Sequence, residues 1–305
     1  MSHGLSAGAA GRPGIATPEG PTPTDEPSLI ADPAHGEGPP RTVSADSVRR
    51  SSRRLGSLVA PALLFVVVIG TWEWLSQTGR LSRFVMPAPS GIGTATISLL
   101  GEAFFWEALR LTLVETVLGF IVGAGGGLIL GVLIGEVKIL RKTIYPYVVL
   151  FQSLPKVALA PIFVIWFGFG TVSKVVMAAT IAFFPLLVNT LTGLDSVNKN
   201  AKMLFMGYGA SRSLMFWKLS MPEILAAVMA GMKTAMTLAL IGAIVAEFVG
   251  AQKGLGILLE RFNFQLQMEM AFAVLMILAL VGLLLYLIVD VIERKVIFWK
   301  GHPVE

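Results

Sequence analysis

The sequence predicts an all-helical membrane protein with about six transmembrane helices, and three observations indicate this fold class. The chain has 305 residues, of which 54% are hydrophobic and only 14% charged, a composition far from that of soluble domains. Six apolar stretches each approach the ~20 residues that cross ~30 Å of hydrocarbon. Basic residues flank these stretches mainly on alternate connections, as the positive-inside rule requires. Most of the chain is therefore expected to lie inside a bilayer.

The N-terminal segment, residues 1–54, differs from the rest of the chain. It contains no aromatic residue, and its eight prolines and seven glycines interrupt any periodicity. Such a segment cannot bury enough apolar surface to fold. It is not a secretory signal, because the first apolar run begins only at Leu58. We predict a disordered cytoplasmic tail.

The apolar stretches define the remaining organisation. Residues 55–112 hold the first transmembrane helix and an external amphipathic segment, residues 113–291 form the core transmembrane domain, and residues 292–305 form a cytoplasmic C-terminal tail. The six predicted spans are Leu58–Leu75, Leu113–Ile134, Tyr145–Phe167, Val175–Leu194, Ile224–Phe248 and Ala271–Val291.

Basic residues set the orientation. With a cytoplasmic N-terminus, fourteen Lys and Arg residues near the span ends are cytoplasmic and six are external. The sequence therefore predicts a multi-pass membrane protein in which both termini and the long loop 195–222 are cytoplasmic.

The second span carries a glycine stripe on one helical face. Its members recur every four residues and are Gly119, Gly123, Gly127 and Gly131, followed by Gly135. Glycine lets another backbone approach closely, which drives helix association in lipid. Two interpretations stay open, packing within the chain, and a subunit-dimer or sliding surface.

The third span combines helix-breaking and polar residues. Pro155 and Pro161 remove backbone donors, and Gln152 and Lys156 lie in its middle. Free carbonyls at membrane depth are tolerated only against protein or a water-filled cavity. These four residues are candidates for lining a pathway, although Lys156 could equally snorkel to an interface or bind a backbone carbonyl.

Four more charged residues lie in or near the spans. Glu115 and Glu247 are expected at solvated helix ends, while Lys233 is expected to form a structural ion pair or an interfacial anchor. Asp290 ends the sixth span. The spans hold no ladder of acids such as proton-driven carriers use.

Several chemistries are excluded. The chain has no cysteine, and His3, His35 and His302 lie near its ends, so the apolar body has no thiolate or histidine site for a metal or for catalysis. It contains no Gly-Lys dipeptide, so a phosphate-binding loop cannot occur. We therefore expect that the chain is not an enzyme, that it binds no cofactor directly, and that any ATP hydrolysis belongs to another polypeptide.

The loop at residues 197–222 is too polar to span the membrane but has helical apolar spacing. It predicts short amphipathic helices at the membrane face, broken at Gly207 and Gly209. Its spacing resembles the cytoplasmic loop of bacterial ABC importer permeases, which reads E-A-A, three residues, Gly, nine residues, Ile-x-Leu-Pro. Gly209 and Pro222 keep that spacing, whereas Met203, Leu204 and Phe205 replace the family's Glu-Ala-Ala.

Three further stretches resemble the nitrate, sulfonate and taurine branch, which includes permeases for pyrimidine precursors. They are Met86–Ser90, the run from Leu154 to Gly168, and Ala246-Glu247 followed by Gly254-Leu255-Gly256. The resemblance implies a type I ABC importer permease fold in a bacterial inner membrane, with two permease copies, two cytoplasmic ATPases that use ATP and an external substrate-binding protein. It implies coupling of ATPase closure to alternating access for a small solute such as a sulfonate, nitrate or pyrimidine precursor.

The resemblance also assigns the coupling residues. The ATPase-coupling surface is expected to comprise Leu204, Phe205, Gly207, Gly209, Ala210, Ser211, Leu219 and Pro222.

Two alternative functions stay open. One is an ion-gradient-driven secondary transporter, which predicts an internal repeat of the spans, and the other is a scaffold whose basic arm binds anionic lipid. Lys156, Lys174, Lys253 and Arg261 favour an anionic substrate only weakly.

Overall fold

The computed structural model describes residues 46–80, 82 and 84–297, and every regular element among them is a helix. The chain divides into two units, Met1–Ser57 and Leu58–Glu305. In the first unit the described residues form the start of α1 (Asp46–Gln77), which begins before the boundary at residue 54 that composition suggests. The predicted tail residues 1–45 and 298–305 lie outside the described part of the chain.

The second unit contains the rest of α1 and all other helices. They are α2 (Pro89–Leu100), α3 (Ala103–Glu136), α4 (Lys138–Gln152), η1 (Lys156–Leu159), α5 (Ala160–Phe167), α6 (Thr171–Ser196), α7 (Lys199–Gly207), α8 (Arg212–Met215), the π-helical η2 (Phe216–Ser220), α9 (Met221–Gly250), α10 (Leu255–Phe264) and α11 (Met268–Val296).

Four helical segments of the described chain are long and apolar enough to cross a membrane. They are Ala103–Glu136, Thr171–Ser196, Arg212–Gly250 and Met268–Val296, and they contain the second, fourth, fifth and sixth predicted spans. The α1 helix adds the shorter apolar stretch Leu63–Gln77. The predicted all-helical membrane fold is therefore confirmed, and the count of six is approximate.

The third predicted span is broken rather than continuous. Its two halves, Lys138–Gln152 and Lys156–Phe167, meet at a bend of 86°, and counting them as one span gives five. The bend lies directly before and at Pro155, which has no amide to donate and disfavours a helical conformation in the residue before it. The proline that the sequence singled out is thus where the chain turns.

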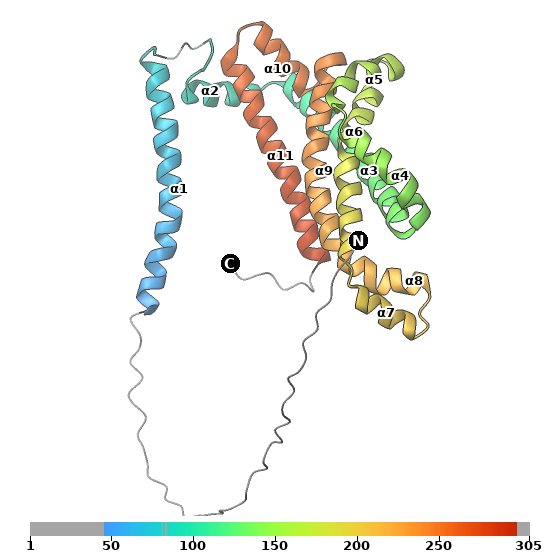
Figure 1. Cartoon of the computed structure of the whole chain (residues 1–305). Helices are drawn as coiled ribbons and strands as arrows, with labels where there is room; N and C mark the ends of the chain where they lie inside the picture. The colour runs from blue at the N-terminus through green and yellow to red at the C-terminus, as the bar shows by residue number, and fades with distance from the viewer. Residues whose placement is uncertain (1–45, 81, 83, 298–305) are drawn as a thin grey trace, which may run out of the picture. The chain divides into compact units, whose positions relative to one another are not determined.

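The core of the second unit is built by α3, α6 and α9, with α11 packed against α9 (Figure 1). Small residues such as Ala178, Ala182 and Ala239 are fully buried between these helices. A Cβ added to Gly242 would lie 2.8 Å from Cα of Ala178, so the backbones of α6 and α9 approach closely. Close approach through small residues is how helices associate where lipid gives no hydrophobic drive.

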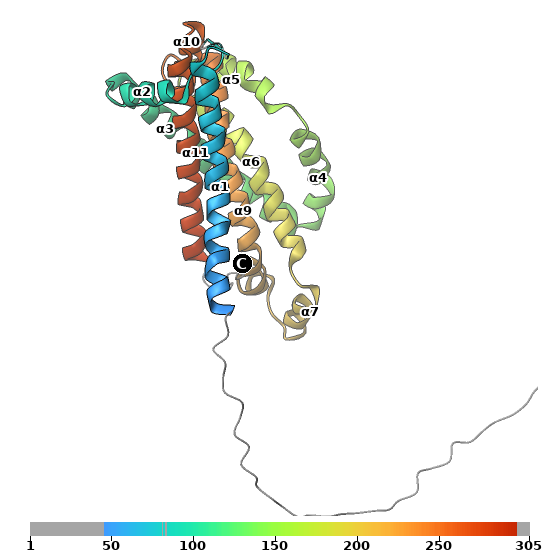
Figure 2. The same ribbon diagram turned by 90° about the vertical axis from the view of Figure 1, so that its left-hand side faces the viewer.

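Several of the elements that connect the core helices lie at two opposite ends of the unit. The helices α5 and α10 lie at one end, and α7 lies at the other, in both views (Figures 1 and 2). Large apolar side chains along α11, including Leu280 and Leu283, are exposed, as expected of a face that contacts lipid.

Candidate functional site

The loop between α6 and α9 folds as two short helices with a glycine turn between them. The helix α7 is capped by Asn198, whose side-chain oxygen accepts hydrogen bonds from the amides of Asn200 (2.8 Å) and Ala201 (3.3 Å). The hydroxyl of Ser211 caps α8 by accepting from the amide of Leu214 at 3.2 Å. Gly209 has φ +74°, in the left-handed region that favours glycine. The two helices and the break at Gly207–Gly209 agree with the sequence pattern.

This loop exposes large apolar side chains outside the packed core. Leu204 is 59% exposed, Tyr208 84% and Trp217 63%. Gly207 and Ser211 are exposed as well, while Phe205, Ala210, Leu219 and Pro222 are half-buried. Clustered exposed apolar residues mark an interaction surface. We call the set Leu204, Phe205, Gly207, Gly209, Ala210, Ser211, Leu219 and Pro222 the loop surface.

The four pathway candidates lie along the bend between α4 and α5. Gln152 ends α4, Pro155 precedes η1, and Lys156 begins η1. The ammonium of Lys156 donates to the backbone carbonyl of Gln152 at 2.8 Å and lies 4.6 Å from the ring centre of Phe184. Pro161 stands one turn further, in α5. Gln152, Pro155 and Pro161 are exposed in the single chain, whereas Lys156 is half-buried.

The glycine stripe of α3 packs against α6. A Cβ on Gly119 would overlap the side chain of Ala178, and one on Gly123 or Gly127 would overlap the backbone of α6. On Gly131 it would lie 2.8 Å from Cβ of Thr190. Backbone atoms cannot move aside as a flexible side chain can. The stripe is therefore buried within the chain in this structure.

Replacing Gly123 with leucine is expected to destabilise the chain. The new side chain would meet the carbonyl and Cα of Ala179, and overpacking of this kind typically costs about 1–3 kcal/mol. Unfolding of the purified chain in detergent measures the effect. Gly125 is the matched control, because a Cβ there has no atom within 4 Å. Equal stability losses in Gly123→Leu and Gly125→Leu would contradict the packing role.

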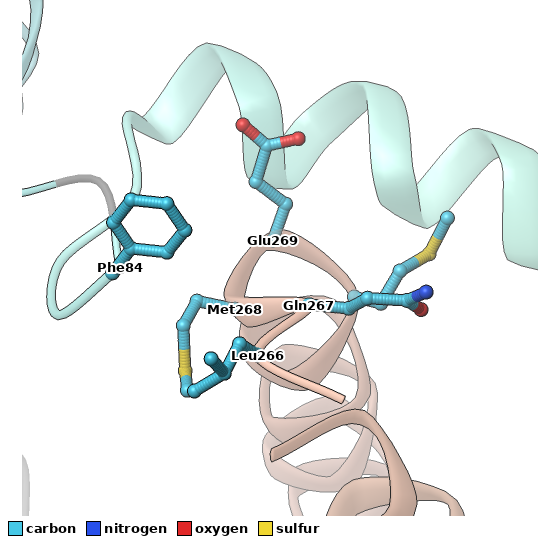
Figure 3. A pocket seen from close by; sticks show the side chains of 6 residues that line it. Phe84, Leu266, Gln267, Met268 and Glu269 are labelled. Atoms are coloured by element: carbon cyan, nitrogen blue, oxygen red, sulfur yellow. The ribbon is translucent and has the colours of Figure 1, made fainter. Parts of the chain in front are cut away.

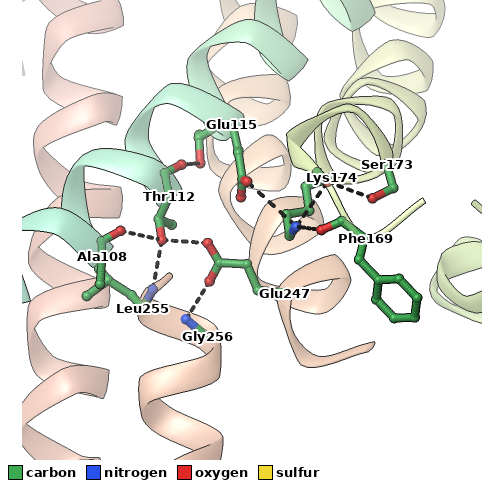
Figure 4. A network of polar contacts seen from close by, with 11 residues as sticks. Ala108, Thr112, Glu115, Phe169, Ser173, Lys174, Glu247, Leu255 and Gly256 are labelled. Carbon is green, nitrogen blue, oxygen red and sulfur yellow. Dashed lines mark hydrogen bonds and ion pairs between the residues drawn. The ribbon is translucent and has the colours of Figure 1, made fainter. Parts of the chain in front are cut away.

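A buried polar network connects α3, α6, α9 and the start of α10 (Figure 4). The carboxylate of Glu247 is fully buried and accepts hydrogen bonds from the hydroxyl of Thr112 (2.6 Å) and the amide of Gly256 (2.5 Å). The same Thr112 hydroxyl accepts from the amide of Leu255 at 2.9 Å. One hydroxyl thus joins the Glu247 carboxylate to the first residue of α10.

Lys174 extends this network to the turn between α5 and α6. Its ammonium donates to the carbonyls of Phe169 (2.9 Å) and Gly170 (3.0 Å), and it lies 4.0 Å from Oε1 of Glu115. Glu115 is only 2% exposed and Lys174 only 4%. The expectation that Glu115 and Glu247 sit at solvated helix ends is therefore wrong. Hydropathy cannot reveal this pairing, since the partners come from different spans and only tertiary packing brings them together.

Two other ion pairs change the interpretation of charged residues. Lys233 of α9 pairs with Asp290 of α11 at 2.5 Å and also contacts Glu293, which confirms the structural ion pair expected for Lys233. Lys253 pairs with Glu107 at 2.7 Å on the surface. Lys174 and Lys253 are both engaged within the chain, so they no longer favour an anionic substrate.

A surface pocket of about 370 Å³ lies at the end of the unit that holds α10 (Figure 3). Phe84 faces it from the segment before α2, and Leu266, Met268 and Glu269 line it from the start of α11 and the turn before it. Leu266 has φ +58°, a strained conformation for a leucine. The pocket contains no predicted site residue.

Comparisons with known proteins agree with this architecture. The family described as "Binding-protein-dependent transport system inner membrane component" matches residues 127–298, more than half of the chain. The formylaminopyrimidine transport permease protein ThiX of Halalkalibacterium halodurans is 34% identical over 81% of this chain and 98% of its own length. The putative aliphatic sulfonates transport permease protein SsuC of Bacillus subtilis is 31% identical over 86% and 95%, respectively. The riboflavin transport system permease protein RibX of Chloroflexus aurantiacus is 32% identical over 80% and 91%.

One solved structure shares the fold. A chain of the MetNI methionine ABC transporter in an inward-facing conformation aligns with a TM-score of 0.51 and 22% identity, covering 63% of this chain and 93% of that one. At this identity the likeness shows the fold alone, and it is the fold that the sequence resemblance implied.

Proposed function

Because this chain belongs to the family of binding-protein-dependent transport system inner membrane components, the permease subunits of ABC importers, we propose that its loop surface binds the ATPase. The chain is the non-enzymatic part of the transporter, and it works with a separate ATPase and a substrate-binding protein. This membership favours an ATP-driven importer over an ion-gradient-driven carrier.

The observation that carries the proposal is the group of exposed apolar side chains on α7, on the turn after it and on η2. A connection between two buried spans has no reason within the chain to expose Leu204, Tyr208 and Trp217. An apolar partner surface would cover them. Because no acid stands at Met203, Leu204 or Phe205, contact there relies on apolar packing rather than on a carboxylate.

We also propose that two identical chains form the pathway. The helix α5, which follows the bend, leaves apolar side chains uncovered, including Ile165 at 80% and Trp166 at 68% exposure. A second copy would cover part of this surface and enclose Gln152, Pro155, Lys156 and Pro161. In this arrangement the pathway lies between the bends of the two copies.

The proposed orientation places both termini and the loop surface in the cytoplasm. The excess of basic residues on that side supports it. The helix α10 and the turn between α5 and α6 then lie at the external end. The proposed domain limits keep residues 1–54 as a cytoplasmic tail, 55–112 as the first transmembrane helix with the external segment, 113–291 as the core and 292–305 as a cytoplasmic tail.

For the substrate we propose a small organic solute of the pyrimidine-precursor class. Support comes from the relative named for formylaminopyrimidine transport, because the match covers 98% of the length of that relative. Because Lys174 and Lys253 are paired within the chain, two of the four cations that favoured an anion such as a sulfonate or nitrate no longer do so, and Lys156 and Arg261 remain.

The test is to purify the chain with its ATPase and reconstitute both in lipid vesicles with the binding protein. We expect no ATP hydrolysis by the chain alone, hydrolysis by the complex, and stimulation when the binding protein carries a formylaminopyrimidine. Stimulation by an alkanesulfonate instead would reassign the substrate. Solute uptake by the chain alone, driven by an ion gradient, would overturn the proposed function.

A further inference from the structure

The start of α10 is fastened by groups from two spans. The first amide of the helix, that of Leu255, donates to the hydroxyl of Thr112 in α3, and the next, that of Gly256, donates to the carboxylate of Glu247 in α9. Amides in the first turn of a helix have no partner within it, and a carboxylate there is also favoured by the helix dipole. Distant residues thus supply the cap that the local sequence lacks.

Two glycines make this attachment possible. A Cβ on Gly256 would lie 2.7 Å from Oε2 of Glu247, and one on Gly254 would overlap the same carboxylate. Gly254 also has φ +139°, which a side chain would strain. The pattern Ala246-Glu247 followed by Gly254-Leu255-Gly256 therefore has a physical meaning. The acid needs backbone without side chains in order to reach the amides.

The attachment is buried, so water does not compete for it. Thr112 and Glu247 are each 0% exposed. A buried hydrogen bond whose partner is removed leaves a desolvated group unsatisfied, which costs more than an exposed one. Separating α10 from α3 and α9 would expose both the carboxylate and the hydroxyl.

The helix held in this way lies at the end of the unit opposite to α7 (Figure 1). One side of it packs through Leu258, Leu259 and Phe262, while Arg261 and Phe264 on the other side are exposed. Under the proposed function, a signal from the binding protein at this end must reach the ATPase at the other end through the spans. The helix α10 can transmit this signal because it is hydrogen-bonded to two spans, α3 and α9.

We infer that Thr112 and Glu247 are positioning residues for transport, which join α10 to α3 and α9 so that these three elements move as one body. This inference rests on the proposed function. Contact of the binding protein at the α10 end then shifts α3 and α9 directly. We call the hydrogen bonds that Thr112 and Glu247 make to the start of α10 the joint. If these bonds are lost, the complex still hydrolyses ATP, but the binding protein no longer stimulates this hydrolysis.

The experiment compares Thr112→Val with Thr116→Val in the complete complex, reconstituted with the ATPase and the binding protein. Both threonines are 0% exposed in α3, but the hydroxyl of Thr116 donates only to the carbonyl of Thr112 in its own helix. We expect Thr112→Val to reduce binding-protein stimulation of ATP hydrolysis by about fivefold or more, without changing basal hydrolysis. Thr116→Val should stay within about twofold of the wild type, and Thr112→Ser should restore stimulation.

Full stimulation in Thr112→Val would overturn the inference, and so would an equal loss of basal and stimulated hydrolysis, which indicates a merely structural role. If Thr112→Val does not assemble, hydrogen exchange in the wild-type complex decides. Amides of Leu255 and Gly256 that exchange as slowly as those in the middle of α9 support the joint, and fast exchange refutes it. Failure of the wild-type chain to bind the ATPase would instead refute the proposed function.

Discussion

Replacing Gly209 with valine is expected to reduce ATP-coupled transport strongly while the spans remain folded. Gly209 has φ +74°, and no atom lies within 4 Å of a Cβ built there, so the cost is one of backbone conformation alone. A left-handed conformation costs an L-residue roughly 1–2 kcal/mol, and a β-branched residue tolerates it least. The turn would rearrange and move α7 relative to α8, and with it the loop surface. We expect transport and stimulated ATP hydrolysis to fall about tenfold or more.

Gly79 provides a matched control for this substitution. It follows α1 with φ +73°, and it too has open space around a built Cβ. Gly79→Val therefore imposes the same local backbone cost outside the loop surface. If the loop surface couples the ATPase to transport, only Gly209→Val uncouples the transporter. Coupled transport by Gly209→Val at the wild-type rate would contradict this role of the loop surface.

Replacing Lys174 with methionine is expected to cause the largest loss of stability. Lys174 supplies the ammonium of the buried network, where it faces Glu115 and holds the carbonyls of Phe169 and Gly170. Methionine fills a similar volume but leaves Glu115 buried without its counter-charge. Removing one partner of a buried ion pair typically costs about 3–5 kcal/mol. Unfolding of the purified variant, followed by circular dichroism in detergent, measures the loss.

A double variant separates the charge effect from the loss of shape. Adding Glu115→Gln to Lys174→Met removes the charge that the single variant leaves unpaired, so part of the stability should return. Arg141→Met is a comparison at the surface. Its bidentate pair with Asp195 (2.7 and 2.6 Å) is about half exposed, and exposed pairs contribute only about 0–1 kcal/mol. Equal losses in Lys174→Met and Arg141→Met would contradict the assigned burial.

The two ends of the molecule bear different kinds of interaction. At the α7 end, Leu204 of the loop surface and the neighbouring Tyr208 and Trp217 expose apolar side chains, which suits a partner that binds and rearranges during a cycle. The network of Thr112, Glu115, Lys174 and Glu247 is polar and buried, which suits a rigid joint. Coupling between distant sites requires an element whose conformational equilibrium is shifted by ligands at both sites. The helices α3 and α9 extend between the two ends and can therefore serve as this element.

The sequence by itself determined the membrane fold, four of the long spans and the break of the third span at Pro155. It also determined the two short helices of the loop and their glycine turn. These features depend on hydropathy, on the missing amide of proline and on the conformational freedom of glycine. All are properties of single residues or of close neighbours along the chain.

Only the tertiary structure decided which charged residues meet. Glu115, Lys174 and Glu247 lie in three different spans, and the hydrogen bond between Thr112 and Glu247 joins residues 135 positions apart. A carboxylate near the end of an apolar stretch has the same sequence signature whether it faces water or a buried ammonium. The glycine stripe of α3 was equally ambiguous until α6 was placed against it. Helix packing resolves both, because it alone fixes which faces of distant spans are in contact.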